Sequence, residues 1–302
     1  GKMATARRVW ERAVARGGRE YRSLLALSQL QLGGVGGPRD ADAAESCLRL
    51  AIEAFPGFGE GAGSAEKLLA DLLRLNGDPD GAMELMEDWA RWNAGDYDVR
   101  LELAGWHIEN GRDAAAVRLL EEEAAAWLGK ERALFVPSGT MANQVALGAW
   151  TRPGDEIICQ RWAHVTTFEG GAAGFLHGLQ SMTLGGRDGR MSAAEVEESM
   201  RPDFIHCPKT ALVCLEQTHN VAGGVVVPME EISSISRVAR EHGVPVHLDG
   251  ARLANAVVAS GVAAPEWTAH ADSVSLCLSK GLGAPVGSVV AGDAAFVERG
   301  MQ

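Results

Sequence analysis

The sequence predicts a two-domain chain, in which an all-α repeat segment precedes an α/β domain with a mainly parallel sheet. Its 302 residues fit two domains of about 150 residues each. The first hundred residues carry apolar side chains at helical spacing, and one turn motif recurs there. Beyond Glu131, short β-like runs alternate with helical stretches. That alternation is typical of a parallel sheet covered by helices on both faces.

Composition and charge narrow the function classes. Hydrophobic residues make up 46% and charged residues 23%, which indicates a globular chain. The net charge of −12 argues against a nucleic-acid partner, because an acidic surface repels phosphate backbones. No apolar run approaches the ~18 residues that span a bilayer, so we expect no membrane partner. The five scattered cysteines show no C-x-x-C spacing, which favours a reducing, cytoplasmic location and predicts no metal site.

The N-terminal helices carry an internal repeat. Asn76-Gly77 followed by Ala82 matches Asn110-Gly111 followed by Ala116, an offset of 111 − 77 = 34 residues. This is the period of tetratricopeptide helix pairs, and a less regular copy occupies residues 21–56. We therefore expect a tetratricopeptide-like segment over residues 1–112, followed by an α/β domain over residues 113–302. The segment is either a surface for a protein or peptide partner or a helical packing domain.

The α/β domain is predicted to contain seven strands in three layers. The strand candidates are apolar runs bounded by turn residues: Ala133–Val136, Glu156–Cys159, Ser181–Leu184, Ala211–Leu215, Pro245–Leu248, Ser273–Leu276 and Gly287–Ala291. Helical patterns fall between most of them, for example at Met141–Trp150, Ala193–Met200 and Met229–Glu241.

Polar residues follow four of these strands at the point where each strand ends. Ser138-Gly139-Thr140 follows the first, Glu216 to Asn220 the fourth, Asp249 with Arg252 the fifth, and Lys280 the sixth. Ligands of open α/β sheets bind at the carboxyl ends of the strands. The sequence therefore predicts a single site at this edge of the sheet.

Each group suits one part of a pyridoxal phosphate site. Ser138-Gly139-Thr140 opens a helix, and the free N–H groups of a helix N-terminus suit a phosphate. Asp249 ends an apolar run, where a carboxylate needs a cationic partner such as a protonated ring nitrogen. Lys280 lies at a strand end, where a desolvated lysine can form a Schiff base with a carbonyl. Anchor, ring partner and lysine together are what pyridoxal phosphate requires.

Each residue alone also has an ordinary structural explanation. The serine–glycine–threonine turn could be a plain helix cap, and Asp249 could be a helix cap or pair with Arg252. Lys280 could be a solvated surface lysine, and His164 an ordinary histidine. Their joint placement at one sheet edge favours the functional interpretation. The sequence has neither the G-x-G-x-x-G spacing of a dinucleotide site nor the G-x-S-x-G elbow of an α/β-hydrolase.

Five ordered motifs resemble the threonine aldolase and β-eliminating lyase family of fold-type I pyridoxal phosphate enzymes. The resemblance covers residues 119–292, and its motifs lie at residues 133–144, 163–171, 215–220, 247–252 and 277–288. It implies that Lys280 is the Schiff-base lysine and that Asp249 pairs with the pyridine nitrogen. It places Arg252 near the ring oxygen and acidic groups, and His164 on the ring face with a role in handling the substrate hydroxyl. The family's phosphate cup is matched by Ser138, Gly139 and Thr140.

The implied activity is retro-aldol cleavage of a β-hydroxy-α-amino acid, such as threonine to glycine and acetaldehyde, by a homo-oligomer. Two alternatives stay open: another β-eliminating pyridoxal phosphate lyase, or a repeat-based binding protein whose α/β domain is catalytically incomplete. The family's N-terminal Ser-Asp-Thr segment is replaced here by the helical repeat. Its small C-terminal domain, which supplies an arginine for the substrate carboxylate, lies outside this sequence. From these departures we expect weak cofactor binding and slow turnover of threonine.

Overall fold

The computed structural model describes residues 2–35, 37–56, 63–93 and 97–302. The chain divides into two compact units, Gly1–Leu119 and Leu120–Gln302. Helix α7, Asp113–Leu128, contributes residues to both of them. Within the described ranges, no helix combines the length and apolarity needed to cross a membrane.

The first unit consists of helices only. Side-chain oxygens of Asp40, Ser64 and Asp78 accept a backbone N–H at the start of three of these helices, which satisfies one free donor at each. The helices before α7 are α1 Lys2–Ala15, α2 Tyr21–Gly33, α3 Ala41–Ala54, α4 Ala65–Leu75, α5 Pro79–Trp92 and α6 Tyr97–Glu109.

The 34-residue repeat corresponds to two equivalent turns between helices. Gly77 and Gly111 both have a left-handed backbone, with φ of 85° and 69°, so glycine suits these two positions. Gly77 lies between α4 and α5, and Gly111 lies between α6 and α7. An ion pair of 2.5 Å joins Arg112, after the second turn, to Asp80, after the first. The predicted helix-pair repeat is confirmed at these two turns.

The second unit is built on one seven-stranded sheet. All seven predicted strands are present, each within one residue of its expected ends. The strand order is β1-β7-β6-β5-β4-β2-β3, and β7 runs antiparallel to the other six strands. The strands are β1 Arg132–Val136, β2 Glu156–Gln160, β3 Gln180–Leu184, β4 Thr210–Glu216, β5 Val246–Asp249, β6 Ser273–Cys277 and β7 Ser288–Gly292.

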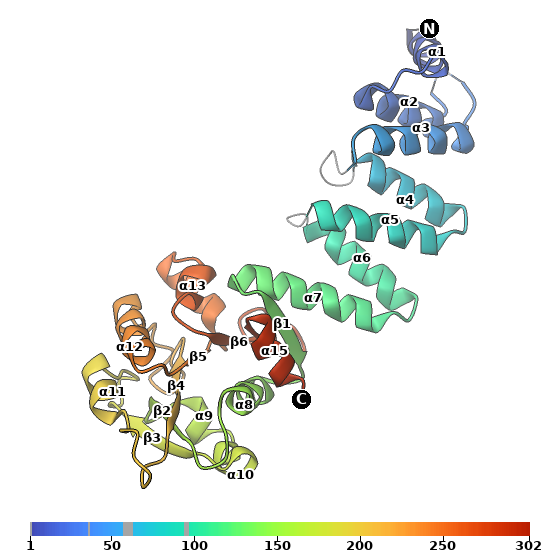
Figure 1. Cartoon of the computed structure of the whole chain (residues 1–302). Helices are drawn as coiled ribbons and strands as arrows, with labels where there is room; N and C mark the ends of the chain where they lie inside the picture. The colour runs from blue at the N-terminus through green and yellow to red at the C-terminus, as the bar shows by residue number, and fades with distance from the viewer. Residues whose placement is uncertain (1, 36, 57–62, 94–96) are drawn as a thin grey trace. The chain divides into compact units, whose positions relative to one another are not determined.

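Helices cover both faces of this sheet (Figure 1). In β2, Ile158 packs into a core with α12 and α13, whereas Ile157 and Cys159 pack into a core on the opposite face. This alternation is the period-two pattern of a strand buried on both sides. The helices after α7 are α8 Gly139–Trp150, α9 His164–Thr167, α10 Ala172–His177, α11 Ala193–Ser199, α12 Met229–Glu241, α13 Leu253–Ser260, α14 Ala264–Thr268 and α15 Ala294–Gly300.

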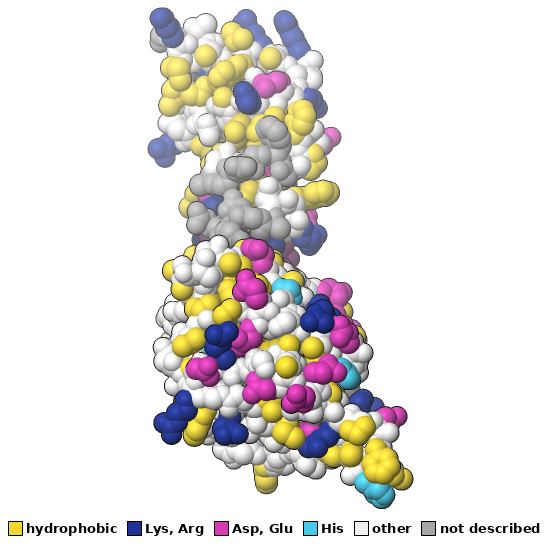
Figure 2. Space-filling model, turned by 90° about the vertical axis from the view of Figure 1, so that its left-hand side faces the viewer, with side chains coloured by type: hydrophobic (Ala, Val, Ile, Leu, Met, Phe, Trp, Pro, Cys, Tyr) yellow, Lys and Arg dark blue, Asp and Glu magenta, His cyan; other side chains and the backbone are white. Residues whose placement is uncertain are grey.

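The surface of the α/β unit carries charges of both signs. On the face drawn in Figure 2, acidic and basic side chains are interspersed among hydrophobic ones.

Candidate active site

The sheet topology brings the predicted site residues to one edge. Strands β2, β4, β5 and β6 are parallel. Strand β1 is parallel to β6, because both run antiparallel to β7. The carboxyl ends of these strands therefore lie at the same edge, where Ser138, His164, Glu216, Asp249 and Lys280 either end a strand or follow one.

Two neighbouring strands present polar side chains on the sheet face that α8 covers. His247 and Asp249 are two residues apart on β5, so they point to the same face. In the parallel register, His247 pairs with Ser273 of β6 and Asp249 pairs with Ser275. All four side chains are buried, and α8 contributes the buried Asn143 above them. A polar layer thus lies inside an otherwise apolar core.

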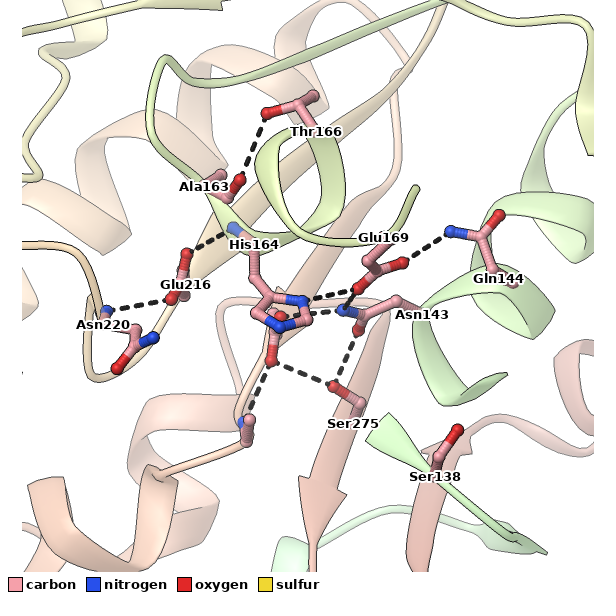
Figure 3. Close-up of polar contacts among 12 residues, drawn as sticks. Ser138, Asn143, Gln144, Ala163, His164, Thr166, Glu169, Glu216, Asn220 and Ser275 are labelled. Carbon is pink, nitrogen blue, oxygen red and sulfur yellow. Dashed lines mark hydrogen bonds and ion pairs between the residues drawn. The ribbon is translucent and has the colours of Figure 1, made fainter. Parts of the chain in front are cut away.

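Asn143 joins two buried carboxylates (Figure 3). Its Nδ2 lies 2.8 Å from Asp249 Oδ2 and 2.8 Å from Glu169 Oε1, so the amide donates to both. Asp249 Oδ1 also accepts the backbone N–H of Ala251 at 3.1 Å. Glu169 Oε2 accepts from Gln144 Nε2 at 2.6 Å. The donors to Asp249 are all neutral, so its charge is not cancelled by a cation among the described residues.

His164 is held by a carboxylate at its ring and by another at its backbone. Its Nδ1 lies 2.9 Å from Glu169 Oε1, and its backbone N–H donates to Glu216 Oε2 at 2.9 Å. Glu216 Oε1 accepts the backbone N–H of Asn220 at 2.9 Å, which ties the loop after β4 to the same carboxylate. Figure 3 shows the imidazole ring beside Glu169 and Asn143. One quarter of the His164 side chain stays exposed, so a ligand could reach it.

Burial and the nearby carboxylates shift the pKa values of three groups in the site. The hydrogen bond that His164 donates to Glu169 raises the pKa of His164 above its ordinary value, and the charge of Asp249 adds to this effect. Burial, followed by the nearby Asp249 charge, raises the pKa of Glu216 to about 7. Burial lowers the pKa of His247 to about 4, so this imidazole is neutral at physiological pH.

The serine–glycine–threonine turn opens α8 as predicted. Ser138 Oγ accepts the backbone N–H of Met141 at 3.2 Å and so caps the helix. Within the described chain, the backbone N–H groups of Gly139 and Thr140 have no hydrogen-bond acceptor. Gly139 has a packing role in addition to any ligand contact, because a Cβ there would lie 2.6 Å from Cys277 Sγ.

Two basic side chains of the site are unpaired. Lys280 and Arg252 are half-buried, and neither forms a hydrogen bond or ion pair with a described residue. Lys280 lies close enough to His164 for its charge to oppose protonation of the imidazole. Arg252 stands at the start of α13, three residues after Asp249, and no ion pair joins the two. The structure therefore gives no support to the ordinary explanation of Asp249 as a partner of Arg252.

His164, Glu169 and Asp249 place three potential metal ligands within 4.8 Å of one another. Asn143, however, directs one N–H to each of the two carboxylates. An amide N–H is a donor and cannot coordinate a cation, so a metal ion between these carboxylates would have to displace it. The donor set fits a hydrogen-bonded pair of anions better than a metal centre.

The sequence interpretation missed the buried polar residues that organise the site. Asn143, Glu169, His247 and Ser275 fell within the quoted motifs or strands, but none was assigned a role. The sequence does carry a signal for part of this set. Polar residues recur at a spacing of two inside two buried strands, as His247 and Asp249 in β5 and as Ser273 and Ser275 in β6. Glu169 has no comparable signal, since it lies in a short segment between two helices.

The fold and the site define an α/β protein with a cluster of buried carboxylates at the carboxyl edge of its sheet. The beta-eliminating lyase family model matches residues 107–302, and the chain belongs to that family. Enzymes of this family generally depend on pyridoxal phosphate. A tetratricopeptide repeat model matches residues 73–123.

Relatives named as threonine aldolases resemble the α/β unit. The chain is 42% identical over 193 residues to low-specificity L-threonine aldolase 1 of Arabidopsis thaliana, a match that covers 63% of this chain and 54% of the relative. It is 40% identical over 191 residues to the low specificity L-threonine aldolase of Escherichia coli K12, with 63% and 56% covered. A solved threonine aldolase from Leishmania major is 26% identical, with a TM-score of 0.51 and 58% and 54% covered. The chain thus spans about half the length of the curated relatives that it matches.

Proposed function

We propose that this chain is the cofactor-binding part of a pyridoxal phosphate-dependent lyase that cleaves the Cα–Cβ bond of a β-hydroxy-α-amino acid. Threonine, giving glycine and acetaldehyde, is the expected substrate. One observation carries the proposal: the buried Asp249 has no lysine or arginine partner among the described residues, while His164 lies near it and the unpaired Lys280 lies near His164. The family membership and the names of the relatives support the same reaction type.

The described residues fit the cofactor group by group. The two free backbone N–H groups at the start of α8, those of Gly139 and Thr140, suit the phosphate. Asp249 Oδ1 and Oδ2 accept only neutral donors, so the carboxylate keeps the charge that a protonated pyridine nitrogen requires. Lys280 has no competing partner within the described chain and is available for the aldehyde carbon.

Each side chain of the site would have a separate role in the reaction. Bound pyridoxal phosphate supplies an electron sink for the bond that breaks at Cα. Asp249 would hold a proton on the ring nitrogen. His164 has its Nδ1 bound to Glu169, which leaves Nε2 to accept the proton of the substrate β-hydroxyl. Arg252, which is unpaired within the described chain, is the candidate cation for the acidic groups of cofactor or substrate.

An absorbance spectrum of the purified chain with added pyridoxal phosphate tests the proposal. We expect a band from bound cofactor that changes when threonine or glycine is added. Product analysis then separates two reactions of the family. Glycine and acetaldehyde support Cα–Cβ cleavage, whereas a 2-oxo acid and ammonia indicate β-elimination. A spectrum without bound cofactor at any concentration contradicts the proposal.

Assembly and the role of the repeats are part of the proposal. A homo-oligomer, either a dimer or a tetramer, is expected for the α/β part, and light scattering after size-exclusion chromatography would measure it. The helical repeat over residues 1–112 is proposed as the surface for a protein or peptide partner, next to a cofactor domain over residues 113–302. The resemblance of residues 73–123 to tetratricopeptide repeats supports this assignment.

A further inference from the structure

Asn143 uses the full hydrogen-bonding capacity of its side chain inside the core. Its Nδ2 donates one hydrogen to Glu169 and the other to Asp249. Its Oδ1 lies 3.1 Å from His247 Nε2 and 3.0 Å from Ser275 Oγ. A primary amide has two donors and two acceptor positions, so no capacity is left over. Such a completely satisfied buried amide has one orientation only.

The two carboxylates determine the direction of every bond behind the amide. Ionised carboxylates only accept, so the nitrogen of Asn143 must face them and its oxygen must face His247. His247 therefore carries its hydrogen on Nε2, and its Nδ1 accepts from Ser273 Oγ at 2.9 Å. Ser273 Oγ in turn accepts from Trp150 Nε1 at 2.9 Å. The bonds form one directed chain from Trp150 to the carboxylate pair.

A neutral donor at this position has a specific electrostatic consequence. Glu169 and Asp249 are buried side by side, and a lysine or histidinium between them would cancel their charge. The amide of Asn143 separates the two anions and leaves both charged. Because His247 is held neutral by burial, the chain delivers hydrogen bonds to the pair and no net charge.

We propose that Asn143 is a positioning residue that couples His164 to Asp249. Through Glu169 it fixes the imidazole ring, and directly it fixes the carboxylate. Both groups are thereby held in one geometry relative to the ring of a bound cofactor. The inference rests on the proposed function, because it concerns the placement of two groups toward pyridoxal phosphate.

The test compares neighbouring variants on α8. Asn143→Ala removes the donors to both carboxylates. Gln144→Ala is the matched control, because Gln144 donates to Glu169 but to no oxygen of Asp249. The dissociation constant of pyridoxal phosphate is measured by absorbance titration for each variant, with the melting temperature as a check on folding. We expect Asn143→Ala to weaken binding about tenfold or more, since a buried charge loses its donor, and Gln144→Ala to weaken it several times less.

Asn143→Asp separates positioning from a purely structural role. The titratable groups that face this position are Glu169, Asp249 and His247, with His164, Glu216 and Lys280 beyond them. A protonated carboxyl at position 143 can donate one hydrogen bond, whereas an ionised one adds a third anion. We therefore expect cofactor affinity in this variant to fall about tenfold between about pH 6 and about pH 8 relative to the wild type.

Equal weakening by Asn143→Ala and Gln144→Ala, or a wild-type pH profile for Asn143→Asp, would overturn the inference. A readout without cofactor is the ¹⁵N spectrum of the histidines in the wild-type chain. A hydrogen on His247 Nε2 across this pH range supports the directed chain, and a hydrogen on Nδ1 refutes it. A wild-type chain that binds no cofactor contradicts the proposed function, and this spectrum then decides on the Asn143 chain separately.

Discussion

Buried charges are paired differently in the helical unit and at the carboxyl edge of the α/β sheet. In the helical unit, Lys67 is nearly buried and lies 2.5 Å from Asp71 and 3.0 Å from Glu102, with its ammonium over the ring of Trp106. Burial acts to lower the pKa of Lys67, but the hydrogen bonds that its ammonium donates to the two carboxylates, together with their charges, outweigh this effect, so the pKa is raised. The charge is stabilised by groups of the same unit.

The carboxyl edge of the α/β sheet instead buries anions without a lysine or arginine partner, although Glu156 elsewhere in this unit pairs with Arg201. Glu216 and Asp249 are buried at strand ends, and Glu169 is buried beside them in the segment between α9 and α10. Their ion-pair partners within the described chain are histidines, His164 at Glu169 and His219 at 3.9 Å from Glu216. Asp249 has none there. A satisfied buried charge, as in the helical unit, indicates a role in folding, whereas an uncompensated one indicates a site that receives a cationic ligand.

The largest expected effect comes from the lysine of the anionic site. Lys280→Ala should abolish covalent attachment of pyridoxal phosphate and lower threonine cleavage by at least about 10³-fold, because the nucleophile is removed. Borohydride reduction followed by peptide mapping should locate the cofactor on Lys280 in the wild type. The exposed Lys209 offers a control, and Lys209→Ala should keep the label. A label on Lys130 or Lys209 would show that Lys280 is not the lysine that binds the cofactor.

Asp249→Asn tests whether the uncompensated anion serves the ring nitrogen. An amide cannot hold the pyridinium proton, so we expect pyridoxal phosphate to bind while turnover falls by about 10²-fold. The same variant should lower the pKa of Glu216, because the Asp249 charge is one cause of its raised value. A carboxyl ¹³C titration would measure this shift. Turnover at the wild-type rate would show that Asp249 has another role.

The fold was predictable because its signals are local. Runs such as Ala211–Leu215 are fully apolar and too short for a helix, and turn residues bound them. The strand order could not be derived from such runs, because pairing depends on contacts between distant segments. The antiparallel placement of β7 between β1 and β6 therefore required the structure.

The site was predictable only at the strand ends. Lys280 and Asp249 follow apolar strands directly, and the carboxyl-edge rule selects them. Glu169 comes between two short helices, and its contact with Asn143 joins residues 26 positions apart. A buried amide such as Asn143 in an apolar helix is visible in the sequence, but its partners are not, because they come from three other segments.

The pH dependence of threonine cleavage tests the effect of the buried carboxylates on His164. Glu169 favours the protonated form of His164, so threonine cleavage that needs a neutral imidazole should rise with pH above 6.5. Glu169→Gln should move this rise to lower pH and increase the rate a few-fold on its acidic side. In the Glu169→Gln variant, the side-chain amide of Gln144 can flip to accommodate the new amide, because Gln144 Oε1 has no partner within the described chain.

The contact between Glu169 and His164 also makes stability depend on pH. The pKa of His164 in the folded chain lies above its ordinary value. The contribution of this contact to the free energy of unfolding is therefore complete below pH 6.5 and is lost as pH rises through the raised pKa. An unchanged pH–rate profile in Glu169→Gln would show that His164 is not the titrating base.

The smallest effect is expected in the helical unit, where the charge is already balanced. Lys67→Met keeps the apolar stem and removes the ammonium, and both carboxylate partners are partly exposed, so water can solvate them. We expect a loss of about 1 kcal/mol in the free energy of unfolding, measured by urea titration with circular dichroism. The exposed pair of Arg49 and Glu45 gives the control, and Arg49→Met should change stability by less than about 0.5 kcal/mol. The cofactor spectrum should be identical in both variants. A cofactor spectrum altered by Lys67→Met would mean that the balanced charge also serves the site, and the contrast between the two units would fail.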